Sequence, residues 1–288
     1  MAKQPRAVAE ERPFPGDKTP VPASQGGLPA IPDYGDDAGA GMENVDRDET
    51  RIPFVRVLQT NSPQVSPADP ARIPGAEAGM LMHMGTNECW PGDGRLEFIA
   101  CFRGKDYVEW VPKNKGGGLV GRHDWNSQTI AKLREVQGRF GKLVTPDGTE
   151  IAQTFYLYGL LLVPDSGPRR TVLGFTSTQI KKYQSVIDRV DSLKFIKDGK
   201  NVQPPLYAWK WRLSTVPEKN NEGSWFGIRV EPVGKTSLES LIPRNDPMFA
   251  LARDFHELVK TGSVTAAAEQ MAGGAAESTE IDDSPPLE

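Results

Sequence analysis

The chain of 288 residues is long enough for one large or two modest domains. Its 25 prolines, 29 glycines and mean hydropathy of -0.47 indicate that part of it does not belong to a folded core. No run approaches the ~18–20 apolar residues of a membrane span, because the longest candidate, residues 155–163, has the length of a strand. The net charge is -4, but the central part of the chain, residues 51–260, is basic, with 29 Lys and Arg against 22 Asp and Glu.

Both ends of the chain are predicted to be disordered. Residues 1–50 form a Pro- and Gly-rich arm with five basic and ten acidic side chains, and residues 261–288 form a tail with six acidic and no basic ones. Acidic tails can simply keep a protein soluble, or they can compete for a cationic groove and recruit partners. The sequence leaves both interpretations open.

The folded core is predicted to start at residues 52–58, an alternating apolar strand that Pro53 places at a sheet edge. Residues 61–74 contain four prolines and indicate a loop. Residues 79–84 indicate a short strand, and their methionines are more typical of core filling than of a binding site.

Residues 95–125 bring strands, aromatic rings, cations and glycines together. Apolar and other side chains alternate from residue 96 to 103 with the period of a strand, and after a turn predicted at Gly104 a second strand covers residues 107–111. Beyond Pro112, lysines and three consecutive glycines indicate a loop without apolar residues that would pack it against the core. We interpret this stretch as the ligand-binding surface of the protein.

The middle of the chain is predicted to hold a helix over residues 127–140, closed by Gly138 and Gly141, and a tight Asp-Gly turn at residues 145–148. Residues 155–163 carry apolar side chains on both faces, which favours a position in mid-sheet.

A second helix is predicted over residues 177–193. Thr176 is its expected N-cap, Gln179 completes a capping box, and Phe175 is placed to pack against Ile180.

The C-terminal part of the core is predicted to begin with an antiparallel pair, residues 206–216 and 225–233, joined by a polar loop. Tyr207, Trp209 and Trp211 are expected on one face of the first strand and Lys210 and Arg212 on the other. A final helix over residues 247–260 has Asp246 as its cap and Pro247 at its first position.

Signals for enzymatic chemistry are weak. His83, Cys89, Cys101 and His123 have no zinc-site spacing, and no nucleophile elbow surrounds a Ser or Cys. The N-terminus lacks a secretory apolar region, so we expect free thiols in a reducing cytoplasm. We predict a protein that is not an enzyme and has neither a metal nor another cofactor.

Two glycine motifs resemble phosphate-binding loops. Gly116, Gly118 and Gly121 satisfy G-x-G-x-x-G, but no helix starts directly after them, and a flexible hairpin loop is the simpler interpretation. Gly234-Lys235-Thr236 resembles the end of a P-loop, but Arg229 stands where the first glycine is required.

A single-stranded nucleic acid is bound by a cationic groove together with rings on which its bases stack. Residues 103–142 hold nine cations against four acids, interleaved with aromatic rings. Core packing is the alternative for Trp110 and Trp209, and a solvated helix face is the alternative for Lys181 and Lys182. The predicted nucleic-acid-binding residues are Arg103, Lys105, Tyr107, Trp110, Lys113, Lys115, Arg122, Trp125, Lys181, Lys182, Lys210 and Arg212.

Several segments in order resemble a family of bacteriophage single-stranded-DNA-binding proteins. They span roughly half the chain and are Ile52-Pro53-Phe54 with Gln59 and Ser62-Pro63-Gln64, Tyr107-Val108-Glu109-Trp110, Gly116-Gly117-Gly118, and Ser177-Thr178-Gln179 with Lys181-Lys182. The resemblance implies an OB-like antiparallel barrel that coats single strands during phage replication or recombination. It also implies that the acidic tail, with Asp282, Asp283 and Leu287, docks replication or recombination proteins, although such tails often end in an aromatic or apolar residue and this one ends Leu287-Glu288.

We therefore predict a mainly β (α+β) fold: an OB-like antiparallel β-barrel over residues 51–245 with inserted helices, a C-terminal helix over 246–260, and disordered acidic termini. The predicted function is sequence-independent binding of single-stranded DNA by stacking and phosphate neutralisation, with no membrane partner and with self-association as an option. The alternative is a phage assembly or virion-associated protein whose charged tails serve protein contacts.

Overall fold

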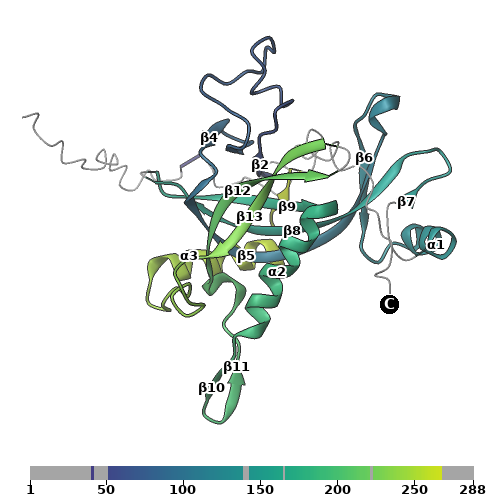
Figure 1. Cartoon of the computed structure of the whole chain (residues 1–288). Helices are drawn as coiled ribbons and strands as arrows, with labels where there is room; N and C mark the ends of the chain where they lie inside the picture. Colours follow the sequence, from purple (N-terminus) through teal and green to yellow (C-terminus); the bar gives the residue numbers. More distant parts are fainter. Residues whose placement is uncertain (1–39, 42–50, 139–142, 165, 221–222, 268–288) are drawn as a thin grey trace, which may run out of the picture. The chain divides into compact units, whose positions relative to one another are not determined.

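A computed structural model describes residues 40–41, 51–138, 143–164, 166–220 and 223–267, without the side chain of Lys113. The chain divides after Ala40 into two units, and the unit that starts at Gly41 is described below. In its described part it is mainly β with three α-helices, as predicted (Figure 1). The helices are α1 (Gln128–Gln137), α2 (Ile180–Ser192) and α3 (Pro247–Lys260).

The strands form one large mixed sheet and two small pairs. In the large sheet the order is β13-β12-β5-β8-β9-β2-β3-β4, with β6 paired to β5 and β7 to β8. The small pairs are β1 (Arg51–Ile52) with β14 (Thr265–Ala266), and β10 (Phe195–Lys197) with β11 (Lys200–Val202). The strands of the large sheet are β2 (Phe54–Val57), β3 (Leu81–His83), β4 (Glu88–Trp90), β5 (Asp93–Trp110), β6 (Leu119–Asp124), β7 (Leu143–Val144), β8 (Glu150–Leu162), β9 (Pro168–Thr176), β12 (Lys210–Asn220) and β13 (Gly223–Pro232).

Strands β5 and β8 form the centre of the sheet. The central strand predicted over residues 155–163 is found in β8, which is mostly buried from Phe155 onward and ends at Leu162. The turn predicted at Gly104 is wrong, because β5 runs through it without interruption and pairs Gly104 with Tyr156. The tyrosines of β8 explain the glycine, since a Cβ at position 104 would lie 3.1 Å from the ring of Tyr158.

Two cores cover the two faces of this sheet. On one face, Phe98, Leu157 and Trp211 pack with Tyr183 and Val186 of α2. On the other face, the core joins side chains of β5 and β8 to α3 through Ile99, Tyr156, Tyr158, Phe255 and Val259. We call these the α2 face and the α3 face. A third, smaller cluster lies where β5 and β8 continue past the body, next to α1 (right side of Figure 1).

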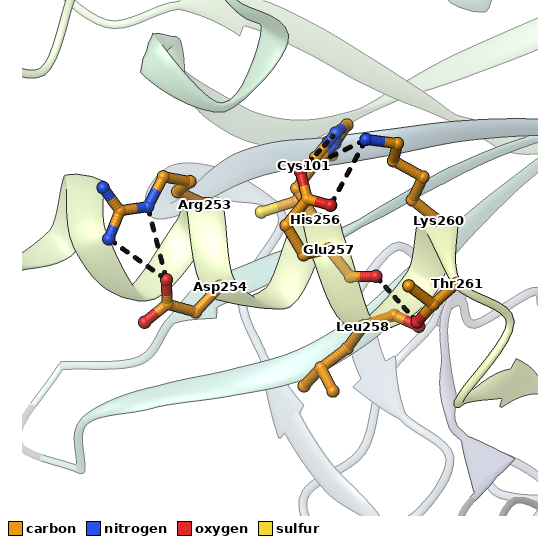
Figure 2. Close-up of polar contacts among 8 residues, drawn as sticks. All are labelled: Cys101, Arg253, Asp254, His256, Glu257, Leu258, Lys260 and Thr261. Carbon is orange, nitrogen blue, oxygen red and sulfur yellow. Dashed lines mark hydrogen bonds and ion pairs between the residues drawn. The ribbon is translucent and has the colours of Figure 1, made fainter.

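Cys101 forms a β-bulge in β5. Ala100 pairs with Gly159 and Phe102 with Tyr158, so Cys101 has no partner residue on β8. Its carbonyl accepts a hydrogen bond from His256 Nδ1 of α3 at 2.8 Å, which requires the proton on that ring nitrogen (Figure 2). The bulge is thus held by α3, and it reverses which side chains of β5 face α2.

Helix α3 has the ends that its sequence predicts. The carboxylate of Asp246 accepts a hydrogen bond from the backbone N–H of Met248 at 2.8 Å, and Pro247 occupies the first turn. At the other end, the hydroxyl of Thr261 donates to the carbonyls of Glu257 and Leu258 (Figure 2). Local sequence therefore determines both ends of this helix.

The large sheet does not close into a barrel through backbone pairing among the described residues, so the predicted barrel is not confirmed. A side chain bridges the gap instead. The amide of Gln59, just after β2, donates to the carbonyl of Phe226 in β13 at 2.9 Å and accepts from the N–H of Phe226 at 2.8 Å. This two-bond contact copies a β-bridge between strands from opposite halves of the sheet.

Several local predictions are corrected by packing. Pro53 does not lie in an edge strand, because it separates β1 from β2 and its carbonyl accepts the N–H of Val172 in β9. The capping box of the second helix is absent, since Thr176 makes no side-chain cap and a 3-10 turn precedes α2.

The remaining differences concern strand ends. The pair predicted at 206–216 and 225–233 forms, but its ladder continues as far as Asn220 and Gly223, so most of the predicted loop is strand. Tyr207 lies in a 3-10 turn and packs on Phe249 rather than with Trp209 and Trp211. The predicted tail starts too early, because Val264, Ala266 and Ala267 are buried and β14 pairs with β1. Residues 1–39, 42–50 and 268–288, on which the rest of the predicted disorder falls, lie outside the described residues.

Candidate nucleic-acid interface

The bulge at Cys101 determines where the cations of β5 point. Beyond it, Arg103 pairs with Leu157 and Lys105 with Phe155 of β8, and directly paired residues of antiparallel strands share a face. Leu157 belongs to the core on the α2 face, so Arg103 and Lys105 lie on that face as well. Without the extra residue they would point to the α3 face, because a one-residue shift moves every side chain of a strand to the other side.

Four aromatic rings form a continuous line on the α2 face, from α1 to α2. We call Tyr107, Trp125, Phe155 and Tyr183 the aromatic row. Trp125 stacks on Tyr107 (5.0 Å between centroids, 15°) and lies 6.0 Å from Phe155, which stacks on Tyr183 (4.7 Å, 26°). Tyr107 and Tyr183 at the ends are buried, whereas Trp125 and Phe155 in the middle are partly exposed.

Cations surround the aromatic row. Lys105 Nζ lies 3.8 Å from the centroid of the Trp125 ring, and the guanidinium carbon of Arg134 lies 5.8 Å from that of Tyr107. The positive charge of Arg103 partly offsets the rise in the pKa of Tyr183 that burial causes. Arg103 and Lys105 are exposed, and no carboxylate in the described part of the chain forms an ion pair with either. Both charges are therefore available to an anionic ligand.

Two predicted stacking rings are not on this surface. Tyr107 is 7 % exposed beneath Trp125, and Trp110 is 8 % exposed on the opposite side of β5, where it pairs with Glu150. The core-packing alternative therefore describes Trp110, and it also describes Trp209, which is fully buried and stacks on Trp211. Neither Tyr107 nor Trp110 offers an open ring face to a base.

The glycine loop is the tip of the β5–β6 hairpin. Gly116, Gly117 and Gly118 all have positive φ, which only glycine adopts readily. Lys115 is exposed and reaches across to the β7–β8 turn, where its Nζ lies 2.5 Å from the position of a Cβ on Gly148. The side chain of Lys113 lies outside the described residues.

Arg122 is in strand β6 rather than in a loop, and it faces away from the aromatic row. It forms an ion pair with Asp106, and its guanidinium carbon lies 5.2 Å from the centroid of Tyr156 on the α3 face. Burial raises the pKa of Tyr156, and Arg122 partly offsets that rise. Arg122 therefore has internal partners and lies apart from Arg103 and Lys105.

Lys181 and Lys182 differ in their surroundings. Glu218 of β12 accepts hydrogen bonds from Lys182 Nζ at 2.5 Å, Gln179 Nε2 at 2.9 Å and Trp225 Nε1 at 2.9 Å, so Lys182 ties α2 to the β12–β13 pair. Lys181 is exposed on the outer side of α2. It lines an open cavity of about 490 Å³ together with Gln184, Ser185, Asp188, Arg189, Ser192 and Ser237.

Lys210 and Arg212 do not lie beside the aromatic row. They flank Trp211 in β12, which belongs to the core on the α2 face, so they point to the other side of the sheet. Lys210 also forms an ion pair with Glu97 at 3.0 Å. The structure thus gathers Arg103, Lys105 and Trp125 at one site and separates them from Arg122, Lys210 and Arg212.

Comparison with known proteins places the chain in a family. Residues 22–265 match the family model described as Pam3 phage gp34-like protein. The chain belongs to this family. The membership supports the predicted phage origin, and the family description names no ligand or activity. No curated protein and no solved structure matches the chain.

For this phage gp34-like chain, the phosphate-loop motifs have structural explanations. The three glycines of G-x-G-x-x-G lie in the β5–β6 hairpin, and no helix starts directly after them. In the P-loop-like segment, the backbone N–H of Lys235 donates to the carboxylate of Glu239 at 2.6 Å, so this N–H already has a partner within the chain. Among the described residues, no three His, Cys, Asp or Glu side chains converge as metal ligands would, and none of the helices has the length and apolar character of a membrane span.

The sequence analysis did not predict three residues of this site. Phe155, Tyr183 and Arg134 complete the line of rings and cations, but they come from β8, α2 and α1. Phe155 could have been found from register, because it stands directly opposite Lys105. Asp282, Asp283 and Leu287 of the predicted docking tail lie outside the described residues.

Proposed function

We propose that this phage gp34-like protein binds single-stranded DNA without sequence preference during phage DNA replication or recombination, and that it is not an enzyme. The observation that carries the proposal is the exposed pair Arg103 and Lys105 beside the half-buried rings of Trp125 and Phe155. Rings of this kind stack on bases at ~1–3 kcal/mol each, and unpaired cations attract the phosphates between them.

The fold is consistent with this proposal. We interpret the curled sheet, whose halves are joined by Gln59 and Phe226, as an OB-like barrel in which a side chain replaces the last strand pairing. OB-like sheets bind single strands across an exposed face with aromatic and cationic side chains. In this interpretation the single-stranded DNA crosses β5 and β8 between α1 and α2. The acidic tail recruits other replication or recombination proteins.

The proposal is tested by anisotropy titrations of labelled oligo-dT over a range of salt concentrations. The double variant R103A/K105A removes the two exposed cations, and K197A/K200A removes two exposed lysines of the distant β10–β11 hairpin as a matched control. Each phosphate contact contributes about 0.7 to the log-log salt slope, so R103A/K105A should lower the slope by about 1.4 and change the melting temperature little. The control should bind oligo-dT as the unaltered protein does.

Two results would oppose this function. The first is absence of salt-dependent binding to oligo-dT at low salt. The second is stable assembly into large particles without nucleic acid, which would favour the alternative of a phage assembly protein. Parallel titrations with oligo-U ask whether DNA is preferred over RNA, because only RNA carries the 2′-hydroxyl.

A further inference from the structure

The β10–β11 hairpin stands apart from the rest of the fold. It follows α2, belongs to no other sheet, and projects from the body at the end of that helix (Figure 1). All residues from Ile196 to Gln203 are exposed. Its turn has positive φ at Asp198 (51°) and Gly199 (71°), the pattern of the tightest hairpin connections. An isolated two-stranded hairpin is at best marginally stable in water. Because its residues from Ile196 onward are exposed, this hairpin adds little to the core.

The side chains of the hairpin are unfavourable for an isolated ribbon. Lys197 and Lys200 are directly paired across the two strands, and like charges in that position destabilise a hairpin. Ile196 is 80 % exposed and Val202 43 %. Local violations of this kind are expected at functional sites, where a partner supplies the missing interactions.

The charge of the hairpin selects the kind of partner. The hairpin region has three lysines, Lys194, Lys197 and Lys200, and one acid, Asp198. Among the described residues only Lys194 of the three forms an ion pair, with Asp191 at 3.8 Å. The body of a second copy of this chain is disfavoured as the partner, because residues 51–260 are themselves basic. The partner should instead be an anion that also offers an apolar surface.

We propose that the hairpin is a duplex-DNA contact, separate from the site on the α2 face. The major groove of B-DNA admits a two-stranded β-ribbon, which places lysines of both strands next to phosphates. An exposed aliphatic side chain such as Ile196 can then contact a thymine methyl or wedge at a base step.

The position of the hairpin suggests how the two sites work together. Tyr183 of the aromatic row is near the start of α2, and the hairpin follows the end of this helix at Ser192, ~14 Å further along at 1.5 Å per residue. Single-stranded DNA bound at the aromatic row and duplex DNA bound at the hairpin would therefore meet at a junction between single-stranded and duplex DNA.

Duplex binding by the full chain is the test. The probes are a labelled blunt duplex, the same duplex with an oligo-dT tail, and oligo-dT alone. K197A/K200A should lower the log-log salt slope for the duplex by about 1.8, two contacts at ~0.9 each, and should leave oligo-dT binding unchanged. I196S should weaken duplex binding without changing the slope, because it removes no charge.

The variant R103A/K105A is the matched control, and it should show the reverse pattern, with weaker oligo-dT binding and unchanged duplex binding. Equal duplex affinity and slope for K197A/K200A and the unaltered protein would overturn the proposal. It would also be overturned if I196S abolished a concentration-dependent dimer, which would make a second copy the partner. The oligo-dT arm reports separately on the function proposed above, so failure of one proposal is distinguishable from failure of the other.

Discussion

Lys105 Nζ covers the Trp125 ring at 3.8 Å, and Tyr107 stacks on the same indole at 5.0 Å. A parallel ring at that distance fills one face of the indole, so the ammonium lies over the other. A base can therefore stack on Trp125 only if it displaces Lys105. The exchange is favourable, because a cation–π contact at an exposed site is worth about 0.5–1 kcal/mol and a base stack about 1–3 kcal/mol.

This relationship makes K105A informative. At low salt the variant should bind oligo-dT more weakly, since one phosphate contact is lost and the salt slope falls by about 0.7. At high salt, where that contact is screened, it should bind at least as tightly as the unaltered protein, because no ammonium has to leave the ring. Anisotropy titrations should thus give two lines that cross. R103A is the control and should give lines that converge without crossing; the same behaviour in K105A would disprove the exchange.

Trp125 itself should contribute one stacked base. W125A should weaken oligo-dT binding by about 1–3 kcal/mol, which is roughly 5- to 150-fold, at every salt concentration. The matched control is W90A, since Trp90 is also partly exposed beneath a cation, Arg169 at 5.9 Å, but lies on β4. Equal losses in the two variants, measured by anisotropy and checked by thermal melting, would place the effect in stability rather than in binding.

Local rules predicted the elements whose determinants are close in sequence. The cap at Asp246, the turn at residues 145–148 and the doubly apolar strand β8 depend on neighbouring residues or on composition, and each is found as expected. The candidate site could not be predicted in this way, because one bulge at Cys101 decides which face Arg103 and Lys105 occupy. Nothing in the local sequence marks that bulge, and its stabilising partner, His256, lies 155 residues away.

Gln59 should contribute to stability because its side-chain amide takes the place of a backbone pairing between β2 and β13. Q59A removes both hydrogen bonds to Phe226, and each neutral hydrogen bond contributes about 0.5–1.5 kcal/mol, so the free energy of unfolding should fall by about 1–3 kcal/mol. Q59E tests the donor alone, because it keeps an acceptor for the N–H but turns a carboxylate oxygen toward the carbonyl. Urea unfolding should rank both variants below the unaltered protein; an unchanged midpoint for Q59A would show that the two halves of the sheet do not need this bridge.

Gly159 is required by the close approach of β8 to β5. A Cβ at this position would overlap the carbonyl oxygen of Ile99 and the ring of Phe98, which are both buried. G159A should therefore cost about 3 kcal/mol or more, at the upper end of overpacking in a core. G121A is the control in β6, where a Cβ meets open space, and it should be close to neutral. Urea midpoints compare the two, and similar values would mean that β8 can shift away from β5.

His83 should make the stability of the fold sensitive to mild acid. Burial, and to a lesser degree the nearby charge of Arg169, hold the pKa of His83 below its ordinary value of 6.5. The unfolded chain therefore binds a proton at a pH where the folded protein does not, so stability should fall as the pH drops through about 6.5 and should level off only below the folded pKa. H83Q should reduce the difference between urea midpoints at about pH 7.5 and about pH 5.5. T86V removes the hydroxyl that lies 3.1 Å from His83 Nδ1 but keeps the titrating ring, so it should retain that difference. An identical pH dependence in H83Q and the unaltered protein would assign the effect to other groups.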